Sequence, residues 1–246
     1  MTGTGDDPER RAAATPRDDG HPIFGDTWVY ESLVRGIPGF GLSTRQAIGI
    51  QLVLFESLVV GLAFYYGLPS TAVVAGTVAV AVATGGSVAM LYIGAATRHL
   101  ALPAVHRRLL FGSSVEVFFG LMAFVITLTY LFTGSPTPLA SLFGSSPPAP
   151  VVFVTLLILW DLCYRVGTSW WTAMVSLWRS LRFRVTPEAA HQCRRIDAVN
   201  VGFAFLELAL LPFVATHTVV VAALLGHVAA VTVVSTAAAL LLETER

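Results

Sequence analysis

Six apolar runs dominate the sequence, and each is close to the roughly 20 residues that an α-helix needs to cross a bilayer. They lie at about 46–68, 71–96, 109–133, 151–178, 199–217 and 218–242. Only 12% of the residues are charged and the mean hydropathy is +0.72, whereas a soluble domain carries roughly 25% charged residues. We therefore predict an all-α, polytopic integral membrane protein in which these runs form a bundle of six transmembrane helices.

The segments outside the apolar runs define the rest of the chain. Residues 1–22 have no periodic apolar pattern and are predicted to form a disordered cytoplasmic tail. Residues 23–45 are predicted to form an amphipathic interfacial segment, with a short helix that holds Trp28 at the level of the lipid headgroups. The transmembrane domain then covers 46–242, and residues 243–246 form a cytoplasmic C-terminal end.

The distribution of basic residues predicts the orientation in the membrane. All fifteen are arginine, and Arg165 is the only one inside a predicted span. The others lie in the N-terminal segments, in the connections 98–108 and 179–195, or at the C-terminus. Arginine is absent from the alternate connections, at 69–70, 134–150 and the turn near residue 217. Cytoplasmic loops carry an excess of basic residues, so both termini are predicted to be cytoplasmic, in a multi-pass protein of the cell membrane.

The run at 151–178 carries a polar stripe along one face. Asp161 and Arg165 are four residues apart, so they share a face of a helix. Continued along the helix, the same sector of roughly 80° contains Thr168, Thr172, Ser176 and Arg179. Polar groups are costly in hydrocarbon, so these six residues, which we call the polar seam, are predicted to face the interior of the bundle.

Three further acids lie in the predicted spans, namely Glu56, Glu116 and Glu207. A charged residue near the bilayer centre costs about 2.5–3.5 kcal/mol on insertion scales, so four acids and one arginine cost on the order of 12–17 kcal/mol. That sum exceeds the stability of a typical domain, so these side chains must face inward, form pairs, take up protons or contact water.

The leading functional interpretation is a small transporter or channel that is linked to protons or to a cation. Asp161 and Arg165 would form a gate or coupling pair, because they are the charged pair within one span. The three glutamates would bind the cation or carry protons, since one arginine cannot neutralise four acids. The predicted lining of the pathway consists of Thr168, Thr172, Ser176 and His227.

Other interpretations fit the same residues. Asp161 and Arg165 can be a structural pair that fixes the rotation of a helix. A single glutamate at a helix interface can be a protonated hydrogen-bond donor, and His227 can be a hydrogen-bonded core residue. The alternative class is therefore a non-transporting membrane sensor, assembly factor or scaffold, for which the basic cytoplasmic face is the sequence support.

An intramembrane enzyme is the third interpretation, and an enzyme is the less favoured class. The spacings Asp161-x-x-x-Arg165 and Phe213-x-x-x-His217 resemble two motifs of the intramembrane CAAX-protease-like family. That family has paired glutamates before its arginine, whereas Leu162 follows the single acid here. The resemblance implies a proteolytic activity. This departure leaves the family's set of site residues incomplete in the present sequence.

The sequence predicts few partners beyond the membrane. The only two cysteines, Cys163 and Cys193, belong to no Cys/His cluster, so neither a metal site nor a cofactor is predicted. The formal net charge is zero, which gives no general attraction to nucleic acid. The predicted partners are the lipid bilayer, anionic lipid headgroups at the arginine-rich cytoplasmic loops, and further copies of the chain in a homo-oligomer.

Overall fold

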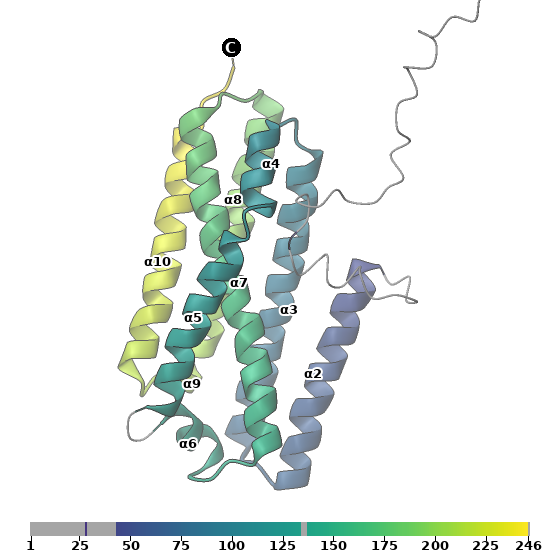
Figure 1. Cartoon of the computed structure of the whole chain (residues 1–246), viewed down its shortest axis with the longest axis vertical. Helices are drawn as coiled ribbons and strands as arrows, with labels where there is room; N and C mark the ends of the chain where they lie inside the picture. Colours follow the sequence, from purple (N-terminus) through teal and green to yellow (C-terminus); the bar gives the residue numbers. More distant parts are fainter. Residues whose placement is uncertain (1–27, 29–42, 134–136, 246) are drawn as a thin grey trace, which may run out of the picture.

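The structure is a computed structural model that describes Trp28 and residues 43–133 and 137–245. Its helices are α2 (Thr44–Tyr66), α3 (Ser70–His99), α4 (Ala104–Phe111), α5 (Val115–Phe132), α6 (Pro138–Phe143), α7 (Ala149–Arg182), α8 (Pro187–Leu206), the 3₁₀ helix η2 (Glu207–Leu210), α9 (Leu211–Val214) and α10 (Thr218–Leu241) (Figure 1). The predicted tail and nearly all of the predicted interfacial segment lie outside the described residues.

Within the described ranges, six helical segments are long and apolar enough to cross a membrane, which confirms the predicted number. Their bounds are Arg45–Tyr66, Ser70–His99, Ala104–Phe132, Ala149–Arg182, Pro187–Val214 and Thr218–Leu241. The fifth segment begins earlier than the apolar run at 199 because its helix already starts at Pro187. The hydroxyl of Thr186 caps that helix by accepting a hydrogen bond from the backbone N–H of Ala189.

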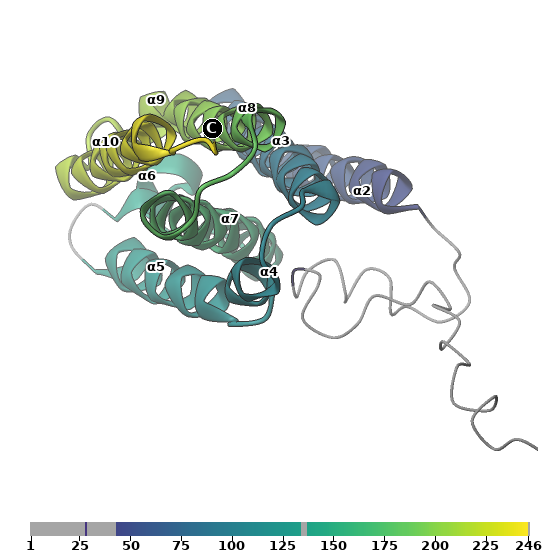
Figure 2. The same cartoon turned by 90° about the horizontal axis from the view of Figure 1, so that it is seen from above.

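The long helix α7 is the centre of the bundle. It packs against α2, α3, α4, α5, α8 and α10. Seen from above, α2, α3, α8 and α10 form a curved row with α7 on its inner side, and α5 lies on the opposite side of α7 (Figure 2). Because of this arrangement, one helix has protein neighbours around most of its circumference, which is the environment that a helix with a polar stripe requires.

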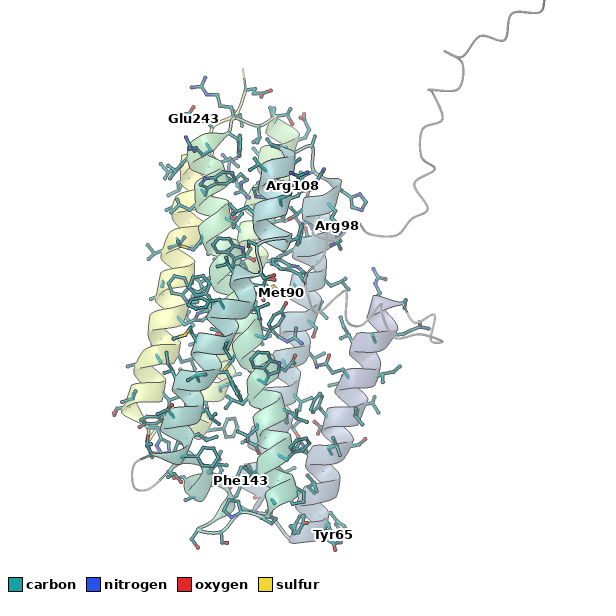
Figure 3. The ribbon with its side chains drawn as sticks, viewed as in Figure 1. Tyr65, Met90, Arg98, Arg108, Phe143 and Glu243 are labelled. Carbon is teal, nitrogen blue, oxygen red and sulfur yellow. The ribbon has the colours of Figure 1, made fainter. Side chains whose placement is uncertain are left out.

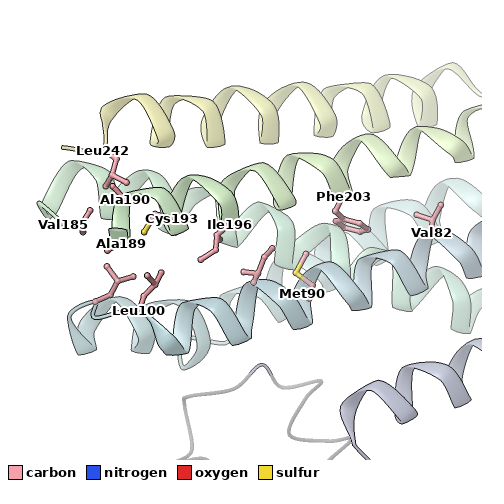
Figure 4. Packing of buried hydrophobic residues seen from close by; sticks show 12 residues of the cluster. Val82, Met90, Leu100, Val185, Ala189, Ala190, Cys193, Ile196, Phe203 and Leu242 are labelled. Carbon is pink, nitrogen blue, oxygen red and sulfur yellow. The ribbon is translucent and has the colours of Figure 1, made fainter. Parts of the chain in front are cut away.

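A hydrophobic core lies between α3 and α8, as Figure 4 shows. Met90 of α3 and the α8 residues Ile196 and Phe203 belong to this core. At its end, Val185 pairs with the C-terminal segment through the backbone, since its N–H donates to Glu243 O at 3.2 Å. The labelled side chains of Arg98, Arg108 and Glu243 lie at this same end of the molecule, and Tyr65 and Phe143 lie at the other (Figure 3).

The third predicted span is interrupted, which the apolar run at 109–133 did not predict. Helix α4 ends at Phe111 and α5 begins at Val115, with Ser114 between them in the left-handed region at φ 54°. The hydroxyl of Ser113 donates to Leu109 O at 2.7 Å. Because a residue in the left-handed region cannot continue a right-handed α-helix, Ser114 separates α4 from α5.

The fifth span is also interrupted. After Leu206 the chain forms the 3₁₀ helix η2 before helical geometry resumes in α9. Pro212 has no N–H to donate to the carbonyl of Leu208, so a regular α-helix cannot continue across this point without losing a bond. Glu207 is the first residue of η2.

Trp28 packs against the bundle, and its position at the level of the lipid headgroups stays a prediction. Its side chain is buried and packs with Leu110, Phe111 and Val175. Its ring meets that of Phe111 edge-on, with the centroids 4.8 Å apart. This tryptophan therefore joins the predicted interfacial segment to α4 and α7.

Candidate functional site

The polar seam faces the interior of the bundle, as its helical spacing predicted. Five of its six side chains are buried, and Asp161 is 13% exposed. From Asp161 to Arg179, a rise of 1.5 Å per residue gives a length of about 27 Å, which is close to the roughly 30 Å of bilayer hydrocarbon. Polar side chains therefore follow α7 for about 27 Å toward its arginine-rich C-terminal end, in a helix of 34 residues that is longer than a bilayer requires.

Asp161 and Arg165 form a direct ion pair. Arg165 Nη2 lies 2.7 Å from Asp161 Oδ1 and 2.9 Å from Oδ2, and Arg165 Nε lies 3.2 Å from Oδ2. Gln51 of α2 adds a bond, since its Nε2 donates to Asp161 Oδ2 at 3.1 Å. The arginine chain passes so close to Gly86 of α3 that a methyl group there would lie 2.5 Å from Arg165 Cδ. Three helices thus fix this pair.

A small pocket adjoins the ion pair. Its wall includes Gln51, Asp161, Thr84 and Phe55, together with three aliphatic residues. The space that it offers to a water-sized sphere is about 10 Å³, at the lower limit of the roughly 10–15 Å³ that one water molecule needs. This pocket fits water or a small ion better than an organic solute.

The acid of α2 has a neutral partner. The hydroxyl of Thr77 on α3 donates to Glu56 Oε1 at 2.7 Å. The second oxygen, Glu56 Oε2, is buried without a hydrogen-bond partner among the described residues. A buried oxygen in this state is satisfied either by a proton or by water, because leaving it unpaired costs about 1–3 kcal/mol.

Glu207 and His227 meet at the break in the fifth span. His227 Nε2 of α10 lies 3.1 Å from Glu207 Oε2, and both side chains are buried. The ring of Trp170 lies beside the imidazole at a centroid distance of 6.2 Å. The carboxyl group therefore sits at the C-terminal end of α8, where helical carbonyls lack their usual donors, with an imidazole opposite it.

Glu116 is at the other break. It lies in the first turn of α5 and is fully buried, and neither carboxyl oxygen has a hydrogen-bond partner among the described residues. The adjacent helices approach closely here, because a methyl group on Gly167 would lie 2.7 Å from Glu116 O and would also contact the backbone of Gly120. An acid near a helix N-terminus is favoured by the helix dipole, although burial without a partner is not.

A second buried ion pair lies between α7 and α8, and the sequence reasoning did not identify it. Arg179 Nη2 is 2.8 Å from Asp197 Oδ2, and the two side chains are only 2% and 3% exposed. One turn further along α8, Asn200 Nδ2 donates to Ser169 O at 3.1 Å. The i, i+3 spacing of Asp197 and Asn200 is a sequence signal for these contacts, but Asp197 lies before the start of the predicted fifth span at 199.

The predicted acids have different partners. Asp161 pairs with Arg165, Glu56 accepts from Thr77, and Glu207 lies against His227. Proton exchange is possible in principle between Glu207 and His227, whereas Arg165 keeps its proton in proteins. Movement of a proton from one of these groups to the next would require water between them.

No metal centre is assembled in the part of the chain that the structure describes. In these residues, no group of three or more His, Cys, Asp or Glu side chains is placed to hold a metal ion. The polar groups of the interior are therefore carboxyl, imidazole, guanidinium, amide and hydroxyl groups on neighbouring helices, and their chemistry is proton exchange and hydrogen bonding.

The fold and this interior define a helical multi-pass membrane protein with ionisable side chains inside its bundle. Residues 23–238 match the profile of a family of unknown function, DUF7530, and the chain belongs to that family. No curated protein and no solved structure matches the chain.

Proposed function

We propose that this protein is a small transporter or channel that moves protons, or a cation coupled to protons, across the cell membrane. The observation that carries the proposal is the buried Glu207–His227 pair, 3.1 Å apart at an interruption of a membrane-spanning helix. Interrupted helices with ionisable groups at the break are a recurring feature of transporter binding sites. Glu207 Oε2 and His227 Nε2 lie within hydrogen-bond distance but are not aligned as a hydrogen bond. A rotation of the imidazole that aligns them would let the pair share one proton in two arrangements, which is what a relay requires.

The other predicted site residues have distinct roles in this proposal. Asp161 and Arg165 form the gate, because separating a bidentate pair would change the charge beside the small pocket. Glu56 and Glu116 carry protons or bind the cation, since both have buried carboxyl oxygens without hydrogen-bond partners among the described residues. Thr168, Thr172 and Ser176 line the pathway along the polar seam.

A second candidate function is a non-transporting membrane sensor, assembly factor or scaffold. The observation that favours it is the separation of the acids into local pairs, with Asp161 on Arg165, Glu56 on Thr77 and Glu207 on His227. Such pairs are also suited to fixing the rotation and register of packed helices. Transport measurements separate the two candidates, because a scaffold needs no exchange of protons.

The location proposed with this function is the cell membrane, with both termini in the cytoplasm. Its support is the gathering of Arg98, Arg108 and Glu243 at one end of the bundle (Figure 3). At that end, exposed arginines such as Arg182 and Arg194 would attract anionic lipid headgroups. A homo-oligomer belongs to the same proposal, since small bundles rarely enclose a wide path alone.

Purified protein in proteoliposomes with an internal pH-sensitive dye tests the transport proposal. The wild type is expected to dissipate an imposed pH gradient, and Glu207→Gln, Asp161→Asn and Glu116→Gln are each expected to slow it at least about tenfold, the loss of roughly 1.4 kcal/mol of barrier stabilisation. The matched control is Glu243→Gln, because Glu243 forms an exposed pair with Arg184 at 2.8 Å, far from the interior.

The dye signals also identify the result that contradicts transport. Wild-type traces at the level of empty liposomes, repeated with several cations and with protein that is folded by circular dichroism, would favour the non-transporting candidate. Equal flux in all three interior variants would remove these acids from the pathway even if the wild type transports.

A further inference from the structure

The interface between α7 and α8 contains buried polar atoms that the protein itself does not satisfy. Within the described residues, Asp197 Oδ1, Asn200 Oδ1, Thr172 Oγ1 and Ser169 Oγ have no hydrogen-bond partner. All four residues are at most 2% exposed. Each such group costs about 1–3 kcal/mol if it stays unpaired. Ser176 of α7 is near enough to donate to the Asp197 carboxylate, so the need for a further partner is greatest at Asn200, Thr172 and Ser169.

These atoms lie on facing surfaces of the two helices. Ser169 and Thr172 are three residues apart on α7, and Asp197 and Asn200 are three apart on α8, so each pair shares one side of its helix. Two contacts fix the register, from Arg179 Nη2 to Asp197 Oδ2 at 2.8 Å and from Asn200 Nδ2 to Ser169 O at 3.1 Å. Ser169 and Asn200 are therefore joined directly across the two helices, and Thr172 and Asp197 lie about one turn away from this contact on the same sides of α7 and α8.

The chemistry of the atoms selects their ligand. A carboxylate oxygen and an amide oxygen accept hydrogen bonds, whereas the two hydroxyl groups can donate and accept. The guanidinium of Arg179 already supplies a positive charge, so a metal cation is disfavoured beside it. Water both donates and accepts, and buried water typically makes about three hydrogen bonds to groups of this kind.

We propose that the α7–α8 interface is a bound-water site, and that Asp197 is the group that passes protons between this water and the arginine-rich end of the bundle. This inference rests on the proposed transport function for its second part. Water at the interface would lie beside the part of the polar seam that runs from Thr168 to Arg179, away from the Asp161–Arg165 pair. It would also give Asp197 a partner for proton exchange, because the guanidinium of Arg179 keeps its proton.

The charged and titratable groups around Asp197 come from several elements. Arg179 of α7 pairs with it directly, Ser176 of α7 faces its carboxylate, and Cys193 of α8 is near enough to interact electrostatically with the pair. His106 of α4 is buried beside the positive charges of Arg179 and Arg107, which disfavours adding a proton to its imidazole. A proton leaving Asp197 would therefore pass to water at this end of the molecule rather than to His106.

Radiolytic hydroxyl labelling in lipid nanodiscs tests the water site without reference to transport. Radicals form from the water that is next to a side chain, so a sulfur atom beside bound water is oxidised quickly. In a variant lacking Cys163 and Cys193, Thr172→Cys is expected to be labelled at least about tenfold faster than Met174→Cys. Met174 is the matched control because it is 44% exposed, on the opposite side of α7, where lipid replaces water.

The labelling result decides the first part of the proposal. If Thr172→Cys fails to fold, Ser169→Cys replaces it, since its hydroxyl lies at the same interface. Labelling of both interface variants that is no faster than that of Met174→Cys would overturn the water site, whether or not the protein transports protons.

Proton flux decides the second part. Asp197→Asn is expected to slow dissipation of a pH gradient at least about tenfold while labelling of the interface persists, because an amide accepts hydrogen bonds but carries no exchangeable charge. If Asp197→Asn retains wild-type flux while Glu207→Gln loses it, the role of Asp197 is wrong and transport stands. If the wild type itself has no flux, transport and the role of Asp197 both fail.

Discussion

Gly167 lies where the central helix α7 crosses α5, and its missing side chain allows the two backbones to touch. A methyl group there would meet Glu116 O at 2.7 Å and the backbone of Gly120 as well. Backbone atoms cannot rotate away as a flexible side chain can, so the contact depends on glycine at this position. The same contact holds the buried Glu116 against α7. At the scale of single residues, close packing and the placement of an ionisable group therefore depend on one glycine.

Gly167→Ala is expected to destabilise the protein by roughly 1–3 kcal/mol, because an added methyl in a filled interface forces the helices apart. Unfolding in mixed micelles of increasing denaturing detergent measures the change. Gly202→Ala is the control, since a methyl group there would have no neighbour within 4 Å. That control should be neutral or stabilising by up to about 1 kcal/mol through helix propensity. Equal destabilisation by both changes would contradict the proposed crossing.

Helices α4–α5 and α8–α9 show that an apolar run and a continuous helix are different things. Each crosses the region of one predicted span, yet each is interrupted close to a glutamate: Glu116 follows the break after α4, and Glu207 follows α8. The causes are local, with Ser114 in the left-handed region in one case and Pro212 lacking an N–H in the other. At the scale of elements, the acids are therefore associated with irregular backbone rather than with regular helix.

Pro212→Ala is expected to restore the hydrogen bond to Leu208 and to convert η2 and α9 into a continuation of α8. This change in helix geometry is expected to rotate Glu207 away from His227. Proton flux in proteoliposomes should therefore fall, while thermal stability is retained or raised. Pro187→Ala is the matched control, because Pro187 occupies the first turn of α8, where no N–H bond is lost. Unchanged flux in Pro212→Ala would show that the break has no part in function.

The whole molecule has two chemically different ends. Arg98, Arg108 and Glu243 gather at one of them, while the other holds Tyr65 and Phe143 (Figure 3). The positive-inside rule predicts a cytoplasmic location for the arginine-rich end. That end also receives the C-terminal segment, which pairs with Val185 through two backbone hydrogen bonds of 3.2 and 2.9 Å. The predicted orientation therefore rests on the arginines of this end, one of which, Arg179, also pairs with Asp197 in the interior.

Labelling with a membrane-impermeant maleimide in intact cells tests the orientation. Ser145→Cys, at an exposed site near α6, should react from outside, whereas Glu188→Cys, exposed at the start of α8, should react only after permeabilisation. The native Cys163 and Cys193 are buried and give a low background. The reverse pattern would place the arginine-rich end outside and contradict the predicted topology.

The sequence by itself determined the class of fold and the inward face of α7. Long apolar runs indicate helices that can cross a bilayer, and the regular spacing from Asp161 to Arg179 indicates residues on one side of a helix. Both patterns are readable in the sequence because they depend only on local helix geometry. Even Asp161–Arg165, an i, i+4 pair, was accessible in this way.

Only the tertiary structure decided which helices meet. The contacts of Gln51 with Asp161, of His227 with Glu207 and of Arg179 with Asp197 join positions that are distant along the chain. Neither composition nor periodicity specifies such partners, since they depend on the order and rotation of packed helices. The two breaks are intermediate cases, because Pro212 and the serines near 113 were visible in the sequence. Their consequence for Glu207 and Glu116 depended on the neighbouring helices.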